Sequence, residues 1–363
     1  MKALGTITDP VFKQKSKYNA LERFFLNLIL DERDLPFIKL SLVLTITLIP
    51  SAIILYSGIL TGWVFWTWAF LHLALGMGLG MGPYILMLHN TSHRKFFKSE
   101  YQFLNHYIPW VLGPFIGQSP ETYFGHHIGM HHAENNLEED RSSTMKYQRD
   151  KLSHFLHYYG TFMAVGIVHV ADYFIKKKRQ KFVTMVIRGE LTFLSLCVGL
   201  SFISFPATLF VFILPIVIAR FGMMSGNWAQ HAFIHQDKPG NSWVNSITCI
   251  NTGYNRKCFN DGYHIGHHLS PHRHWTDMPA DFLKNKDKYV ANEAIVFEGL
   301  DYFQIWFYLM CKNYKKLAQH FVNINDHYKS DDEIIALLKS RTQQFTYEQR
   351  MASLKEWQQG HKH

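Results

Sequence analysis

The chain has 363 residues, of which 47% are hydrophobic and 15% aromatic, and its formal net charge is +9. The apolar residues gather in long blocks between charged segments, which argues against two soluble domains of ordinary size. No nucleic-acid-binding module accompanies the basic residues, so we expect no nucleic-acid partner and interpret the charge as a surface near anionic lipid. The four cysteines are scattered without a CxxC pair and indicate neither a disulfide framework nor an iron–sulfur site.

The chain begins with a polar, basic segment, residues 1–36, which lacks the apolar core of a signal peptide. Two apolar blocks follow, at about residues 37–60 and 63–88. Each is long enough to cross a bilayer, which takes about 20 residues. The second block contains the sequence LGMGLGMG, whose small residues indicate close helix packing or the wall of a tunnel, and His72, which we expect to be a satisfied core histidine.

A third apolar block, residues 191–219, is too long for a single span. Pro206 divides it into a helical hairpin with arms at about residues 187–204 and 206–225. The sequence therefore predicts an all-α integral membrane protein with four transmembrane helices in two hairpins, and a cytoplasmic helical cap that carries the histidine motifs described below.

The basic residues set the predicted orientation. Lys and Arg flank the spans on one side, whereas the turn at residues 56–62 and the one around Pro206 carry no charge. The positive-inside rule then places both termini in the cytoplasm. We expect residues 154–180 to form interfacial helices, because a fifth span would separate the histidine motifs. A membrane domain would thus occupy residues 37–283, followed by amphipathic cytoplasmic helices at 284–363.

Ten of the 22 histidines cluster in four motifs: HNTSH, GHHIGMHH, NWAQH and HIGHH. On a helix, residues three or four positions apart share a face, so His89 and His93 project together. The same spacing joins His127 to His131 and His264 to His267 and His268. Imidazoles that converge on one point are typical of a transition-metal site, although imidazole alone does not identify the metal. There are too many histidines for one ion, so we expect two metals side by side. The chain has no HExxH motif, which argues against a zinc protease.

In this order, the motifs resemble the histidine boxes of the membrane fatty acid desaturase superfamily, which includes desaturases, hydroxylases and a decarboxylase that forms terminal alkenes. The resemblance covers roughly residues 37–280. It implies two iron ions, with O₂ as co-substrate, and places Asn227 near one iron. The implied iron ligands are His89, His93, His127, His131, His132, His231, His264, His267 and His268.

Several site assignments stay open at this stage. The family's second box is usually HxxHH, whereas this chain has HxxxHH, so either His126 or His127 is the first ligand of this box; we favour His127. His235 is an alternative to His231. Asp261 and Glu134 are expected either to orient imidazoles or to be solvated loop carboxylates.

The resemblance implies an O₂-dependent non-haem di-iron oxidoreductase that abstracts hydrogen from a fatty acid or acyl-lipid in the bilayer, and we favour a fatty acid desaturase. The alternatives at the same site are a fatty acid decarboxylase forming 1-alkenes and an alkane or lipid hydroxylase. A free-acid enzyme needs a cation for the carboxylate; the candidates are Arg94, Arg141, Arg220 and Arg256.

The implied enzyme also needs a source of electrons. No fused electron carrier is evident, so we expect a separate donor, either a ferredoxin or a cytochrome b5 with its reductase. A non-redox membrane zinc protein is the alternative from another class. Such a protein would need fewer histidines than this chain has, and it would need some carboxylates within the membrane.

Overall fold

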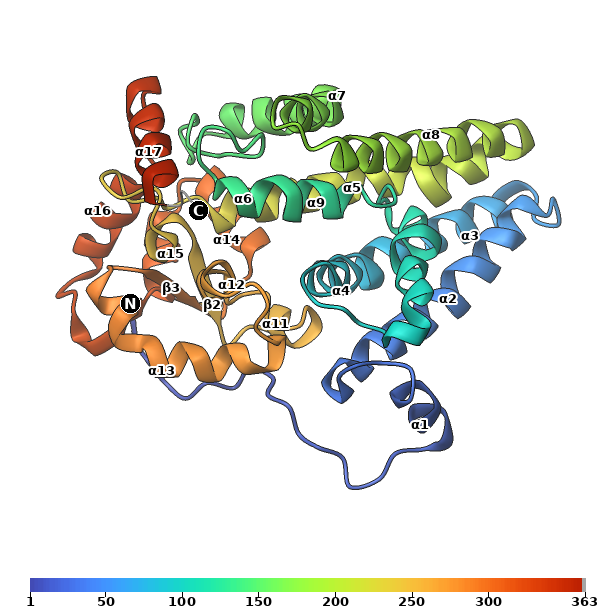
Figure 1. Ribbon diagram of the computed structural model, residues 1–363, viewed down its shortest axis with the longest axis horizontal. Coiled ribbons are helices and arrows are strands. Elements are labelled where there is room, and N and C mark those ends of the chain that lie inside the picture. Colours follow the sequence, from blue (N-terminus) through green and yellow to red (C-terminus); the bar gives the residue numbers. More distant parts are fainter. Residues whose placement is uncertain (361–363) are drawn as a thin grey trace. The chain divides into compact units, whose positions relative to one another are not determined.

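The computed structural model describes residues 1–360 and is mostly helical (Figure 1). The α-helices are α1 (Ala20–Leu26), α2 (Leu35–Tyr56), α3 (Gly62–Ala74), α4 (Met81–His93), α5 (Thr122–Phe124), α6 (His132–Glu134), α7 (Leu152–Lys176), α8 (Gln180–Thr208), α9 (Leu214–Gln230), α10 (Ser242–Asn245), α11 (Gly253–Lys257), α12 (His264–Leu269), α13 (Met278–Ala291), α14 (Tyr302–Met310), α15 (Tyr314–His320), α16 (Asp331–Arg341) and α17 (Tyr347–Gly360). Four π-helical stretches lie at Leu75–Gly80, Ile108–Leu112, Gly125–His131 and Leu209–Ile213.

Short strands depart from the expected all-helical fold. Strand β1 (Lys2–Ala3) pairs in parallel with β4 (Val322–Asn323). Strand β2 (Ile247–Ile250) pairs in parallel with β3 (Ile295–Glu298), with Ile247 opposite Ile295. All four residues of β2 are buried and three of them are β-branched, as is typical of a parallel strand covered on both faces.

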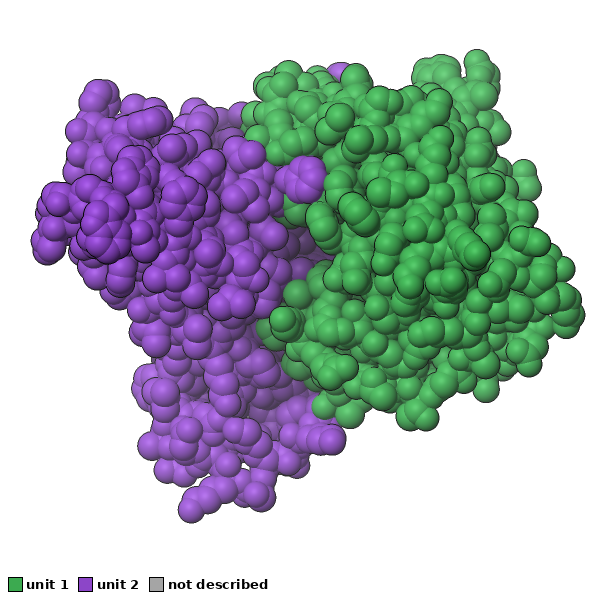
Figure 2. Space-filling view, turned by 180° about the vertical axis from the view of Figure 1, so that it is seen from behind, with its two compact units in different colours: residues 1–11, 129–173, 222–363 green, residues 12–128, 174–221 purple. Residues whose placement is uncertain are grey.

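The chain divides into two compact units, coloured separately in Figure 2. Unit 1 comprises residues 1–11, 129–173 and 222–363, and unit 2 comprises residues 12–128 and 174–221. Each unit is therefore built from separated parts of the sequence. Within unit 1, the hydroxyl of Tyr263 donates to Asp9 Oδ2 at 2.7 Å, which fixes the N-terminal segment beside the third histidine motif.

Three helical stretches are long and apolar enough to cross a membrane: Glu32–Tyr56, Gly62–His93 and Gln180–Gln230. The first two contain most of the apolar blocks expected at 37–60 and 63–88. The third is interrupted at Ser204, where φ is −157° and ψ is 101°. The Ser204 hydroxyl then accepts from the amide of Ala207 at 3.3 Å. A serine cap followed by Pro206 in the first turn is typical of the start of a new helix.

The chain reverses direction at this interruption. The ring centroids of Phe193 and Phe212 lie 6.5 Å apart, whereas 19 residues of straight helix would separate them by about 28 Å. The guanidinium of Arg220 pairs with Glu190, which also accepts from the Ser119 hydroxyl. The two arms on either side of Ser204 therefore pack against each other in unit 2 as a hairpin.

The glycine-rich stretch of the second apolar block forms the π-helix Leu75–Gly80. A Cβ on Gly80 would lie 3.0 Å from Cδ2 of Leu44, so the glycine lets this helix approach α2 closely. Nearby, His72 Nδ1 lies 3.0 Å from the Ser51 hydroxyl on α2. Both observations fit helix packing, with His72 as a satisfied core histidine.

The segment that leads into the second histidine motif lies directly against the hairpin of unit 2. A Cβ on Gly189 of α8 would lie 1.7 Å from the Pro120 carbonyl oxygen, so only glycine fits there. Gly117 has a φ of 74° and approaches the backbone of Pro215 in the same way. These backbone contacts fix the start of the histidine-bearing segment that follows.

Candidate metal centre

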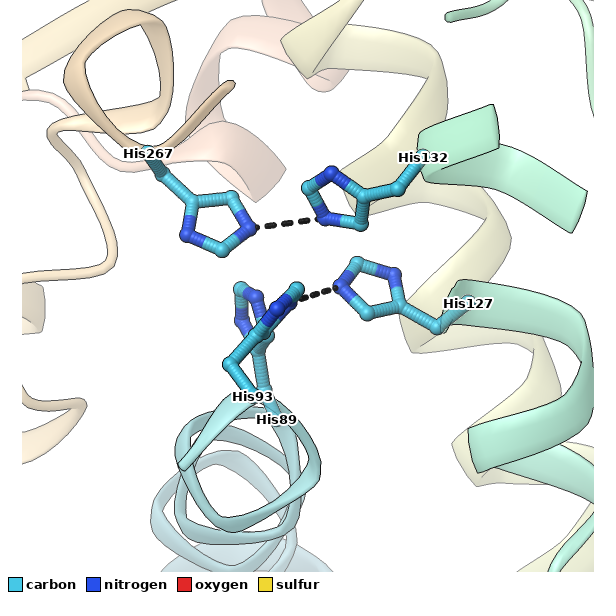
Figure 3. A group of neighbouring side chains, drawn as sticks. All are labelled: His89, His93, His127, His132 and His267. Carbon is cyan, nitrogen blue, oxygen red and sulfur yellow. Dashed lines mark hydrogen bonds between the residues drawn. The ribbon is translucent and has the colours of Figure 1, made fainter. Parts of the chain in front are cut away.

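The first histidine motif lies at the C-terminal end of α4. His89 and His93 are one turn apart, with ring centroids separated by 5.2 Å. His127, from the π-helix Gly125–His131, places its Nε2 3.0 Å from that of His93. The ligand nitrogens of these residues lie within 4.8 Å of one another. Figure 3 shows this group, which we call the three-histidine set of unit 2.

Two further histidines face each other in unit 1. His132 begins α6 and His267 lies on α12, and their Nε2 atoms are 2.9 Å apart (Figure 3). We call them the histidine pair of unit 1. Two ligands alone do not complete a metal site.

A second cluster, the four-histidine set, lies wholly within unit 1. It consists of His131, His231, His264 and His268, whose ligand nitrogens lie within 4.8 Å of one another. The Nε2 of His264 is 3.4 Å from that of His231 and 3.0 Å from that of His268. His231 is 0% exposed and His264 is 2% exposed, so water is largely excluded from these rings.

The spacing of the nitrogens fits metal coordination. Metal–imidazole bonds of about 2.1 Å, at octahedral or tetrahedral angles, separate two ligand nitrogens by about 3.0 to 3.4 Å. Four pairs of histidines in these groups have Nε2–Nε2 distances that run from 2.9 to 3.4 Å. The donor set therefore fits transition-metal ions, which imidazole binds well.

The ring orientation of two members of the four-histidine set is fixed through Nδ1. His131 Nδ1 donates to Asp140 Oδ2 at 2.7 Å. His231 Nδ1 donates to the carbonyl oxygen of Asn245 at 2.8 Å. In both residues Nε2 is left as the lone-pair donor. Burial, and then the neighbouring His131, lowers the pKa of His231 to about 3, so this imidazole is neutral and able to bind a metal at neutral pH.

The grouping differs from the one expected from helical spacing. His127 and His131, expected to share a face, belong to different sets, because the backbone between them is π-helical. A π-helix bonds residue i to i+5, so the four-residue spacing of an α-helix does not apply there. On α12, His264 and His268 join the four-histidine set, whereas His267 faces His132.

His126 and His127 were the two candidates for the first ligand of the second histidine motif. The Nε2 of His127 is the nitrogen that lies next to His93.

Asn227 lies on α9 and was expected near one metal. Its amide donates to the Ser142 carbonyl oxygen at 3.0 Å and to the Tyr158 hydroxyl at 2.7 Å.

His235, the alternative to His231, is not in the four-histidine set. Its Nε2 lies 3.7 Å from Glu293 Oε2. The structure thus groups His231, and not His235, with the other imidazoles of unit 1.

The two carboxylates expected near the boxes each accept a hydrogen bond from a tyrosine. Asp261 Oδ2 accepts from the Tyr254 hydroxyl at 2.7 Å. Glu134 Oε1 accepts from the Tyr173 hydroxyl at 2.5 Å. Asp140 accepts from a clustered histidine, and sequence reasoning did not single it out. Its signal in the sequence is membership of the acidic stretch at residues 133–140.

Comparison with known proteins agrees with this geometry. The model of the family described as fatty acid desaturase matches residues 63–299, well over half of the chain. No curated protein matches. The matched region contains every histidine of the two clusters, and the family generally depends on two irons. The chain therefore belongs to the fatty acid desaturase family of membrane oxidoreductases.

Proposed function

We propose that the protein is a membrane-bound, O₂-dependent, non-haem di-iron fatty acid desaturase. The observation that carries this proposal is that nine histidines gather in groups, and that four pairs among them have Nε2–Nε2 distances of 2.9 to 3.4 Å. The sequence lacks the HExxH motif of zinc metalloproteases, which argues against that class of enzyme.

The four-histidine set would hold one iron, with Asn227 one turn before His231 on α9 as a proposed neighbour of that ion. As membership of the family implies two irons, we propose that the remaining histidines of the three boxes are ligands of the second iron. These are His89, His93, His127, His132 and His267.

Iron fits the reaction better than zinc does. When bound, a pair of irons supplies the oxidising power that breaks an unactivated C–H bond with dioxygen and electrons. Desaturation converts –CH₂–CH₂– into –CH=CH–, and O₂ takes up two further electrons and two protons to give two molecules of water. The chain's own residues hold the metals, exclude water and place the acyl methylenes beside the site.

We also propose the orientation and the partners. Both termini and the metal site would lie in the cytoplasm, because the basic segments flank the spans on that side. The acyl substrate would come from the bilayer. Electrons would come from a separate ferredoxin, or from a cytochrome b5 with its reductase.

The candidate cations bear on whether a free acid is the substrate. Arg94 pairs with Asp31 and Asp34, Arg141 with Asp172, and Arg220 with Glu190. Of the four candidates, Arg256 is the one without a carboxylate partner among residues 1–360. A carboxylate-dependent decarboxylase would therefore depend on Arg256, whereas a desaturase acting on a bound acyl group would not.

Expression in a heterologous host, followed by mass spectrometry of lipids, free acids and headspace hydrocarbons, tests the proposal. A new double bond in acyl chains of unchanged length is the expected product. A hydroxylated chain, or a terminal alkene one carbon shorter, would overturn desaturation in favour of another outcome at the same site. The Arg256→Ala variant should form the same product at an unchanged rate.

A further inference from the structure

Asp140 is a buried carboxylate in direct contact with a member of the four-histidine set, His131. Its side chain is 0% exposed, and that of His131 is 3% exposed. Each of its oxygens has a separate task. Oδ2 accepts from His131 Nδ1 at 2.7 Å, and Oδ1 accepts from the amide and the hydroxyl of Ser142 at 2.8 and 2.6 Å. Three donors therefore hold the carboxylate in one orientation.

Ser142 is itself held by the helices of unit 1. Its carbonyl oxygen accepts from the Asn227 amide of α9 at 3.0 Å and from the Tyr158 hydroxyl of α7 at 3.1 Å. The hydroxyl of Tyr158 also accepts from Asn227 at 2.7 Å. Hydrogen bonds through Asp140 and Ser142 thus connect the His131 ring to helices α7 and α9. None of the residues in this series of bonds is solvent-exposed.

The same loop holds a second member of the set. The Thr144 hydroxyl donates to the His231 carbonyl oxygen at 2.6 Å, and the Asn136 amide donates to Asn245 Oδ1 at 3.0 Å. The backbone carbonyl of Asn245 in turn accepts from His231 Nδ1. Residues 135–149 therefore contact the four-histidine set at two of its members.

We propose that Asp140 is a positioning residue for the iron held by the four-histidine set, and that Ser142 holds Asp140 in place for this role. The inference rests on the proposed di-iron function. An ionised carboxylate can only accept, so it keeps the proton of His131 on Nδ1 and presents Nε2 to the metal. It also makes the imidazole a stronger ligand, an effect worth about 10- to 100-fold in metal affinity.

The test is Asp140→Asn in the full-length protein. The amide has the same shape, but it cannot accept from both His131 and Ser142, because one of its two ends is now a donor. We expect one of two irons to be released to a chelator about 10 to 100 times faster than in the unchanged protein. Glu138→Gln is the matched control: Glu138 lies two residues earlier and bonds Arg350 at 2.5 Å, and its variant should release iron at the original rate.

A double-mutant cycle separates positioning from general support of the fold. If Asp140 acts through His131, Asp140→Asn causes no further acceleration of iron release in a His131→Ala background. Equal acceleration in both backgrounds, or unchanged release from Asp140→Asn alone, overturns the inference. Should Asp140→Asn not accumulate, Ser142→Ala removes one of the bonds to the carboxylate, and we expect up to about tenfold faster release.

The two proposals fail differently. If the unchanged protein binds no iron, the di-iron function fails, and with it this inference. If the unchanged protein binds two irons and Asp140→Asn releases both at the original rate, only the role of Asp140 is refuted.

Discussion

Replacing His127 by Ala and, separately, His126 by Ala tests the assignment within the second histidine motif. The two residues are adjacent in sequence, but the Nε2 of His127 lies 3.0 Å from that of His93 and its ring centroid lies 4.5 Å from that of His89. His127→Ala therefore removes a proposed metal ligand. His126→Ala removes an imidazole of the same size from the adjacent position, which is not a proposed ligand. The pair controls for the loss of side-chain volume and for the local helix.

The magnitude follows from the number of ligands. Four-ligand structural zinc sites bind with about 10–16 kcal/mol, or about 2.5–4 kcal/mol per ligand. Losing one ligand at a comparable energy lowers affinity by roughly 10²- to 10³-fold. We therefore expect His127→Ala to retain about one of two irons after dialysis against a weak chelator, and His126→Ala to retain both.

Iron content by elemental analysis, with circular dichroism to confirm the helical fold, measures both variants. Loss of iron from His126→Ala with full retention by His127→Ala would refute the assignment. Equal loss from both variants would show that the effect is local unfolding and would refute the reasoning from the His93 contact.

Further predictions concern the hairpin of unit 2 and the metals. Glu190→Leu removes the carboxylate that pairs with Arg220 and should lower the free energy of unfolding by about 3 kcal/mol. Glu190→Leu with Arg220→Leu should recover most of this loss, as measured by thermal unfolding in detergent. Gly189→Ala places a Cβ against Pro120 and should lower the free energy of unfolding by at least about 1–3 kcal/mol. On the same helix, a Cβ at Gly199 would meet no atom within 4 Å, so Gly199→Ala should raise the free energy of unfolding by about 0.5–1 kcal/mol. An unchanged midpoint for Gly189→Ala would contradict the close approach. Removal of iron by a strong chelator should lower the midpoint of thermal unfolding. The reason is that a ligand present at 1,000 times its dissociation constant stabilises the folded state by about 4 kcal/mol. A midpoint that does not depend on iron would argue against iron binding by the folded protein.

The histidine motifs could be predicted because their signal is local. His89 and His93 lie four residues apart on an α-helix, and the structure keeps that relation. The interruption near Pro206 was also foreseeable, since proline breaks a helix and Ser204 is a good cap.

The division of the histidines between the sets was not foreseeable, because it depends on a π-helix at residues 125–131 that no residue pattern announces. Long-range contacts escaped prediction for a different reason. Asp9 bonds Tyr263 across 254 positions, and periodicity within one segment carries no information on such pairs. Asp140 stood in an acidic stretch whose other members gave the same sequence signal, so only the fold distinguishes it.

The most direct measurement for the di-iron proposal is the metal content and the X-ray absorption spectrum of protein purified without oxygen from an iron-supplemented culture. We expect about two irons per chain, each bound mainly by imidazole nitrogens. A single ion per chain, zinc in place of iron, or ions bound mainly by carboxylate oxygens would contradict the proposal.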